Sequence, residues 1–94
     1  MNTEKGITLN LVLTHHWFDE IAAGRKRIEY REIKPHWTRL IWDRRDKITH
    51  VKFQRAYNNT APEIIYRVTF IDKGMCPYTG WTGKFYFITF TEEE

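Results

Sequence analysis

Apolar and polar residues alternate with a period of two in several short segments, and this pattern constrains the fold more than any other feature of the chain. Such alternation is typical of strands that bury one face. It predicts strands at residues 7–13, 27–31, 48–56, 63–72 and 84–91. The last two of these strands are apolar on both faces, so neither is expected to have a solvent-exposed face. We therefore expect a closed or nearly closed barrel of five to six strands, because closure removes the sheet edges.

Two short helices are predicted in the N-terminal half. Thr14 is a suitable N-cap for a helix over 15–23, and Gly24 favours its termination. Pro35 suits the first turn of a second helix, in which Trp37 and Ile41 lie one turn apart and predict a buried face. With both helices packed on the outside of the barrel, the fold class is α+β, mainly β. Residues 58–62 and 73–83 are predicted loops, and the second is partly apolar, as loops that line a site often are.

Length and composition exclude several classes of protein. The 94 residues fit one domain, 1–94, and are too few for a Rossmann or TIM-barrel enzyme. The single cysteine, Cys76, cannot form an internal disulfide or a Cys-based zinc site, and it favours a reducing, cytoplasmic location. No apolar run approaches the roughly 20 residues that span a bilayer, so no membrane partner is expected. Serine is absent, which excludes a serine triad.

Positive charge is concentrated in one part of the chain. Residues 24–55 hold eleven basic and four acidic residues, a net +7, whereas the whole chain carries +3. Such a block favours a polyanionic partner, most plausibly nucleic acid. The alternative is a solvated basic surface with no partner.

The densest polar pattern runs from Gly24 to Arg31. Glu29 and Arg31 are two apart in a predicted strand and share a face, and the flexible stem of Lys26 reaches the same space. A lysine beside a carboxylate and an arginine can bind phosphate, or can act as an acid or base when it is partly buried. The alternative is an ordinary set of solvent-facing ion pairs.

The segment from Leu11 to Arg31 resembles the signature of the ASCH domain, the activating signal cointegrator homology family, whose hallmark is Gly-x-Lys-x-x-Glu-x-Arg. All four hallmark positions are met, at Gly24, Lys26, Glu29 and Arg31. The resemblance continues through residues 30–37, 53–57 and 80–90 and so covers nearly the whole chain. It implies a PUA-like β-barrel whose cleft is lined by Lys26, Glu29 and Arg31.

The resemblance also implies a function. Family members are generally RNA-binding modules, so we expect a domain that binds RNA or a modified nucleoside without a cofactor or a metal, and as a monomer. Some bacterial members are enzymes, either ribonucleases or amidohydrolases of N4-acetylcytidine, and in an enzyme Lys26 and Glu29 are the expected catalytic residues. Glu29 stands where the deacetylating members have a threonine, and residues 75–83 lack their catalytic glutamate. Hydrolysis of N4-acetylcytidine by the mechanism of the deacetylating members is therefore not expected. A protein-interaction module is a third hypothesis.

Three further residues are candidates for ligand contact. Arg55 shares a strand face with Val51 and Phe53, so it needs a partner, either a ligand or Glu29. Tyr57 and the asparagines at 58 and 59 can add hydrogen-bond donors. Trp81, in the glycine-rich loop, can stack on an unpaired base or fill the barrel. His15 and His16 are adjacent and diverge by about 100° on a helix, and the other two histidines are distant in sequence, so no metal site is predicted.

Overall fold

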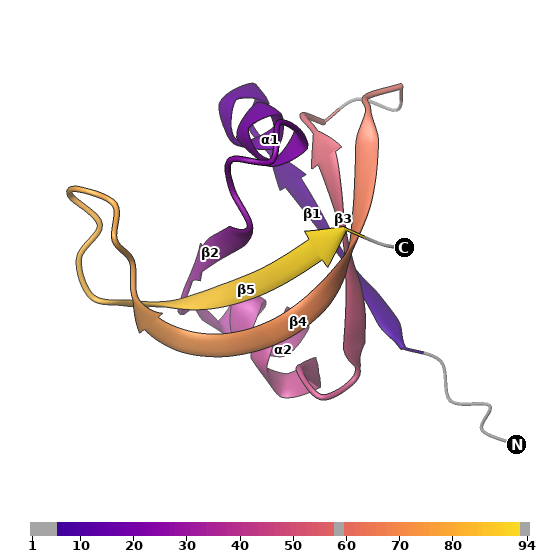
Figure 1. Cartoon of the computed structure of the whole chain (residues 1–94). Coiled ribbons are helices and arrows are strands. Elements are labelled where there is room, and N and C mark those ends of the chain that lie inside the picture. The colour runs from indigo at the N-terminus through magenta and orange to yellow at the C-terminus, as the bar shows by residue number, and fades with distance from the viewer. Residues whose placement is uncertain (1–5, 58–59, 93–94) are drawn as a thin grey trace, which may run out of the picture.

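The structure is a computed structural model that describes residues 6–57 and 60–92. The elements follow one another as β1 (Ile7–Leu13), α1 (His15–Ala22), β2 (Ile28–Glu32), α2 (Pro35–Leu40), the 3-10 turn η1 (Trp42–Arg44), β3 (Ile48–Arg55), β4 (Glu63–Met75) and β5 (Lys84–Glu92) (Figure 1). All five predicted strands and both predicted helices are confirmed. The second helix ends at Leu40 and is followed by the separate turn η1.

The five strands form one curled sheet in the order β1-β3-β4-β5-β2 (Figure 1). β1 pairs with β3 in parallel, and the other pairs are antiparallel. The sheet is a half-barrel, because in the described part of the chain β1 and β2 remain its two edges. A barrel-like, mainly β fold is therefore confirmed. The two edges are joined at one point, where the guanidinium of Arg31 donates to the carbonyl oxygen of Val12 at 3.2 Å.

A bulge in β4 explains why that strand is apolar on both faces. The register with β5 shifts between Val68 and Phe70, which reverses the faces along the strand. Tyr66 is buried on one side of the shift, while Ile65 and Phe70 remain about half exposed. The apolar residues on the second face therefore do not indicate closure. β4 also extends to Met75, so the following loop begins at Cys76 rather than at residue 73.

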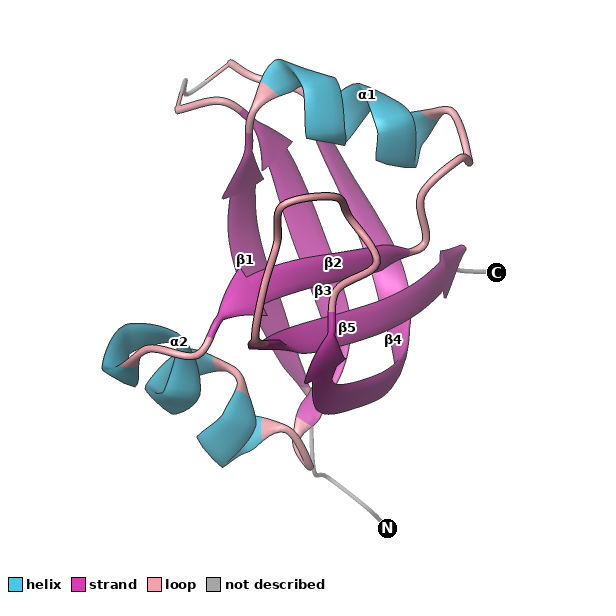
Figure 2. Cartoon of the chain, turned by 90° about the vertical axis from the view of Figure 1, so that its left-hand side faces the viewer, coloured by secondary structure: helices cyan, strands magenta, loops and turns pink. Residues whose placement is uncertain are grey.

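The helices lie at the two ends of the half-barrel, α1 at one and α2 with η1 at the other (Figure 2). α1 contributes Phe18 and Ile21 to the core. The rest of the buried core comes from the concave face of the sheet and the residue after α2: Leu9, Leu11, Leu13, Ile41, Ile48, Val51, Phe53, Tyr66, Tyr86, Ile88 and Phe90.

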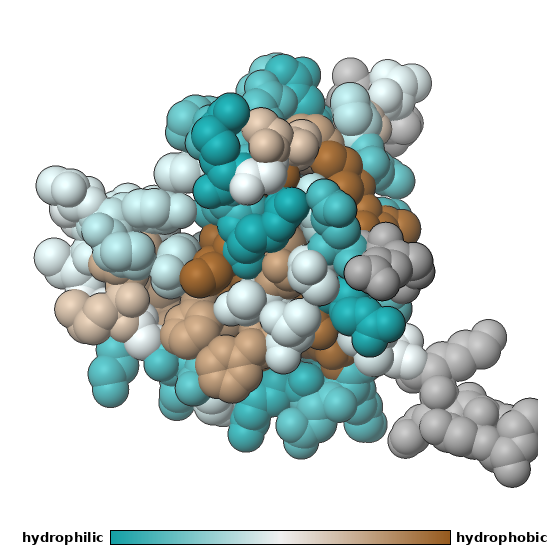
Figure 3. All heavy atoms as spheres, viewed as in Figure 1, coloured by the Kyte–Doolittle hydropathy of each residue, from teal (hydrophilic) through white to brown (hydrophobic). Residues whose placement is uncertain are grey.

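Apolar side chains gather over the curved part of β4 and β5, with hydrophilic atoms above and below them (Figure 3). Phe70 and Ile65 of β4 are among the exposed apolar residues. None of the helices within 6–57 and 60–92 has the length and apolar content that crossing a membrane would need.

Candidate functional site

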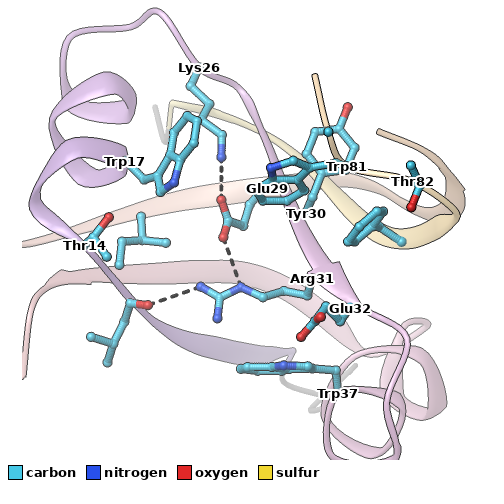
Figure 4. A pocket seen from close by; sticks show the side chains of 14 residues that line it. Thr14, Trp17, Lys26, Glu29, Tyr30, Arg31, Glu32, Trp37, Trp81 and Thr82 are labelled. Atoms are coloured by element: carbon cyan, nitrogen blue, oxygen red, sulfur yellow. Dashed lines mark hydrogen bonds and ion pairs between the residues drawn. The ribbon is translucent and has the colours of Figure 1, made fainter. Parts of the chain in front are cut away.

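A cavity of about 540 Å³ occupies the gap between the two edge strands, β1 and β2 (Figure 4). β1 supplies Val12 and Leu13, and β2 supplies residues 29–32. Trp17 of α1, Trp37 of α2 and residues 80–82 of the loop before β5 complete the walls. The incomplete closure of the barrel thus creates the cavity, which we call the cleft.

Three charged side chains form the floor of the cleft. The ammonium of Lys26 lies 2.5 Å from Glu29 Oε1, and Arg31 Nε donates to Glu29 Oε2 at 3.0 Å (Figure 4). The exposed fractions of these side chains are 8% for Lys26, 7% for Glu29 and 17% for Arg31. They are therefore not a solvent-facing set of ion pairs. Both carboxylate oxygens of Glu29 have a cationic partner, which fixes the orientation of the group.

Strand register turns Glu29 and Arg31 inward. Glu29 lies opposite Ile88 and Arg31 lies opposite Tyr86 across the β2–β5 pair, and both β5 residues are buried in the core. Cross-strand partners point to the same face. The prediction that Glu29 and Arg31 share a face is confirmed. Lys26 joins them because the chain turns back after α1 at Gly24, whose φ of 84° is one that glycine adopts readily.

Aromatic rings stand over both cations of the floor. The ammonium of Lys26 lies 4.6 Å from the centre of the Trp17 ring, and the guanidinium of Arg31 lies 4.8 Å from that of Trp37. Cation–π contacts of this kind help to hold a charge that has little access to water. Trp81 lies at the cleft and is 38% exposed, so its ring is available to a ligand.

Tyr78, the other aromatic residue of the loop, does not line the cleft but packs against Trp17 and Tyr30, which do. Its ring stacks on Trp17 with centroids 5.2 Å apart and meets Tyr30 edge to face at 5.6 Å. Burial raises the pKa of both tyrosines above the ordinary value. Of the two aromatic residues of the loop, Trp81 therefore offers the open stacking surface at the cleft.

The structure places Arg55 and Tyr57 away from the cleft. Arg55 Nε donates to Asp19 Oδ1 of α1 at 3.1 Å, so of the two partners considered for Arg55, a ligand or Glu29, the pairing with Glu29 is wrong. The reason is that Glu29 already has two cationic partners, while α1 brings Asp19 to the end of β3. Tyr57 is 91% exposed and does not line the cleft. The predicted donors at 58 and 59 lie outside the described residues.

Several cleft residues were not predicted from the sequence. Helical spacing with Ile21 and Ile41 predicts core positions for Trp17 and Trp37, with stacking on a base as the alternative for Trp37. Both are half-buried and line the cleft. Thr14 was assigned to helix capping, yet its side chain makes no capping hydrogen bond and lines the cleft. Thr82 carried no signal beyond its position in the glycine-rich loop.

The four charged side chains that line the cleft, Lys26, Arg31, Glu29 and Glu32, sum to zero, and Lys34 lies outside the lining. Lys26 and Arg31 share Glu29, and Glu32 at the edge of the cleft pairs with Lys34 at 3.0 Å. Within the described ranges, no group of three or more His, Cys, Asp or Glu side chains could hold a metal ion. Aromatic walls above a polar floor are suited to a flat, uncharged group that carries hydrogen-bond donors and acceptors.

Comparison of the chain with protein-family models, curated proteins and solved structures finds no match in any of the three.

Proposed function

We propose that this chain is an ASCH domain with a PUA-like fold, and that it binds RNA or a modified nucleoside by holding one base in the cleft. One observation carries the proposal. Lys26, Glu29 and Arg31, three residues of the hallmark motif, meet as a buried network on the floor of a cavity walled by tryptophans.

The dimensions and chemistry of the cleft support a base as its occupant. A volume of about 540 Å³ is in the range of small-molecule sites and accommodates one nucleoside. Trp81 offers an exposed ring for stacking. Glu29 can accept a hydrogen bond from an exocyclic amino group, and Lys26 can donate to an exocyclic oxygen. Arg31 positions Glu29 and is itself fixed by the Val12 carbonyl.

Titration calorimetry with the common ribonucleosides and N4-acetylcytidine tests the proposal. We expect at least one to bind the wild type, and Trp81→Ala to weaken that binding about tenfold, because stacking contributes roughly 1–3 kcal/mol per base. Tyr57→Ala is the matched control, since Tyr57 is an exposed aromatic residue outside the cleft. It should change the affinity less than about twofold.

Two results would contradict the proposal: no nucleoside binds at millimolar concentration, or Tyr57→Ala weakens binding as much as Trp81→Ala does. Chromatography of these mixtures, and of a labelled RNA incubated with the protein, separates binding from hydrolysis. Release of acetate from N4-acetylcytidine, or shortening of a labelled RNA, that Lys26→Ala abolishes would establish the enzymatic alternative instead.

A further inference from the structure

Cations at the two ends of the half-barrel differ in their partners. Around α1 they pair with carboxylates, as Arg25 does with Glu20, Arg55 with Asp19 and Arg27 with Glu92. Around α2 and η1, no carboxylate of the described residues forms an ion pair with Arg39, Arg44, Arg45, Lys47 or Lys73. Lys34, which precedes α2, does pair with Glu32. The five cations named above are therefore the part of the positive charge at this end that remains available to a ligand.

Two of these available cations converge on one ring. Arg45 lies 4.0 Å and Lys73 4.5 Å from the centre of the Trp42 ring, although the first follows η1 and the second belongs to β4. Arg45 is further held by a 2.7 Å hydrogen bond from its guanidinium to the Trp42 carbonyl. Both cations contribute to a positive potential around the Trp42 ring, and an anion bound beside that ring is attracted to each of them.

The ring that holds the two cations is itself fixed. Trp42 stacks nearly parallel on the buried Tyr86, with centroids 5.5 Å apart. The Tyr86 hydroxyl shares a short hydrogen bond with Thr38 of α2. The Trp42 ring that Arg45 and Lys73 contact is thus held by the core, so a ligand that binds there meets a preformed surface.

Strand register connects this pair to the cleft. Tyr86 lies opposite Arg31 in the β2–β5 pair and opposite Lys73 in the β4–β5 pair. Arg31 and Lys73 are therefore two strands apart in one row, about 10 Å at the usual strand spacing, and point to the same face. A chain anchored in the cleft can reach both cations.

We propose that Arg45 and Lys73, held over Trp42, bind the phosphodiester backbone of an RNA strand whose base occupies the cleft. The placement of the base rests on the proposed function; the phosphate contact rests on the convergence of the two cations. The cleft has balanced charge and accepts the base, while the available cations beside η1 accept the backbone.

The test compares two charge-matched double variants in their binding of a fluorescent single-stranded decanucleotide at several salt concentrations. Arg45→Gln with Lys73→Gln should weaken binding about tenfold at low salt and reduce the salt slope by about 1.4, because two phosphate contacts are lost. Arg25→Gln with Lys52→Gln removes one arginine and one lysine that have carboxylate partners. This control should weaken binding less than about threefold.

The outcomes separate the two proposals. Equal losses in both double variants, or no binding of the decanucleotide at low salt, would overturn the phosphate contact. NMR can also show whether millimolar inorganic phosphate saturates Arg45 and Lys73. If it does and no RNA binds, the pair binds only small anions, and the proposed contact with RNA phosphate is wrong. Failure of nucleosides to bind while the decanucleotide still depends on Arg45 and Lys73 would contradict the cleft proposal alone.

Discussion

Lys26 and Glu29 form an ion pair of 2.5 Å in which both side chains are more than nine-tenths buried. A pair so removed from water has lost most of its hydration, and what remains is mutual attraction and the surrounding hydrogen bonds. Glu29 has a second cationic partner in Arg31, whereas the hydrogen-bonding partner of the Lys26 ammonium is Glu29. The two residues of the pair therefore differ in how many charged partners each retains when the other is replaced.

This inequality predicts an order of destabilisation. Glu29→Gln keeps the shape but leaves two buried cations without a counter-charge, so we expect it to lower the free energy of unfolding by about 3–5 kcal/mol. Lys26→Met keeps the length of the side chain and leaves Glu29 paired with Arg31, so the loss should be about 1.5–3 kcal/mol. Urea unfolding followed by circular dichroism measures both. Equal losses, or a larger loss for Lys26→Met, would contradict this interpretation of the network.

Arg31 connects the two edges of the half-barrel, and a lysine in its place cannot make the same contacts. Arg31 donates from one nitrogen to Glu29 and from another to the Val12 carbonyl. Arg31→Lys preserves the charge but loses one of these hydrogen bonds, at a cost of about 1.5–3 kcal/mol. Thermal or urea unfolding of the wild type and the variant measures this loss in the free energy of unfolding.

Arg27→Lys is the matched control for this substitution. Arg27 also bridges a backbone carbonyl and a carboxylate, but its contacts are long, at 3.3 Å, and Glu92 is largely exposed. The control should cost less than about 1 kcal/mol. If the two substitutions cost the same, burial of the Arg31 contacts has no special effect on stability.

Much of the fold could be predicted from the sequence, because strand alternation and helix boundaries are local features. The bulge between Val68 and Phe70 could not, since an unbroken run of β-forming residues carries no sign of a shift in register. For the same reason the apolar second face of β4 was taken as evidence of closure. In the structure it leaves Ile65 and Phe70 about half exposed.

The candidate site, like the fold, could be predicted from the sequence only in part. Spacing alone placed Glu29 and Arg31 on one face, but the apolar Ile28 and Tyr30 on the other face gave no reason to expect the charged face inside. The register of β2 with β5 places the charged face inside. The partner of Arg55 could not be predicted either, because it depends on where α1 lies over the sheet. Local pattern thus groups Glu29 and Arg31 on one face, and tertiary packing makes that face the floor of the cleft and supplies the walls.

The ion pair of Arg55 with Asp19 should contribute little to stability. The side chains are 34% and 56% exposed, so solvent screens the attraction. A double-mutant cycle with Arg55→Gln and Asp19→Asn should give a coupling of about 0.2–1 kcal/mol that decreases with added salt. Nucleoside affinity should remain unchanged in both single variants. A lower nucleoside affinity in Arg55→Gln would indicate that Arg55 contacts the ligand.

Backbone conformation at Gly80 supports the position of Trp81. Gly80 has a φ of +87°, and a Cβ added there would meet no heavy atom within 4 Å, so the cost of a substitution is conformational. Gly80→Ala should lower the free energy of unfolding by about 1 kcal/mol. Gly80→Asn should cost less, because asparagine tolerates this region better. Equal losses from the two variants in thermal unfolding would contradict this explanation.

Burial of Tyr78 makes stability sensitive to alkaline pH. Burial raises the pKa of its phenol above the ordinary value of 10.0, so the folded state holds the proton more tightly than the unfolded state. This contribution is complete below pH 10 and is lost as pH rises through the folded-state pKa. Tyr78→Phe keeps the ring that stacks on Trp17 and removes the titrating group. The free energy of unfolding, measured in urea from pH 8 to 11, should therefore fall less steeply in this variant than in the wild type, and identical slopes would show that the phenol is not perturbed by folding.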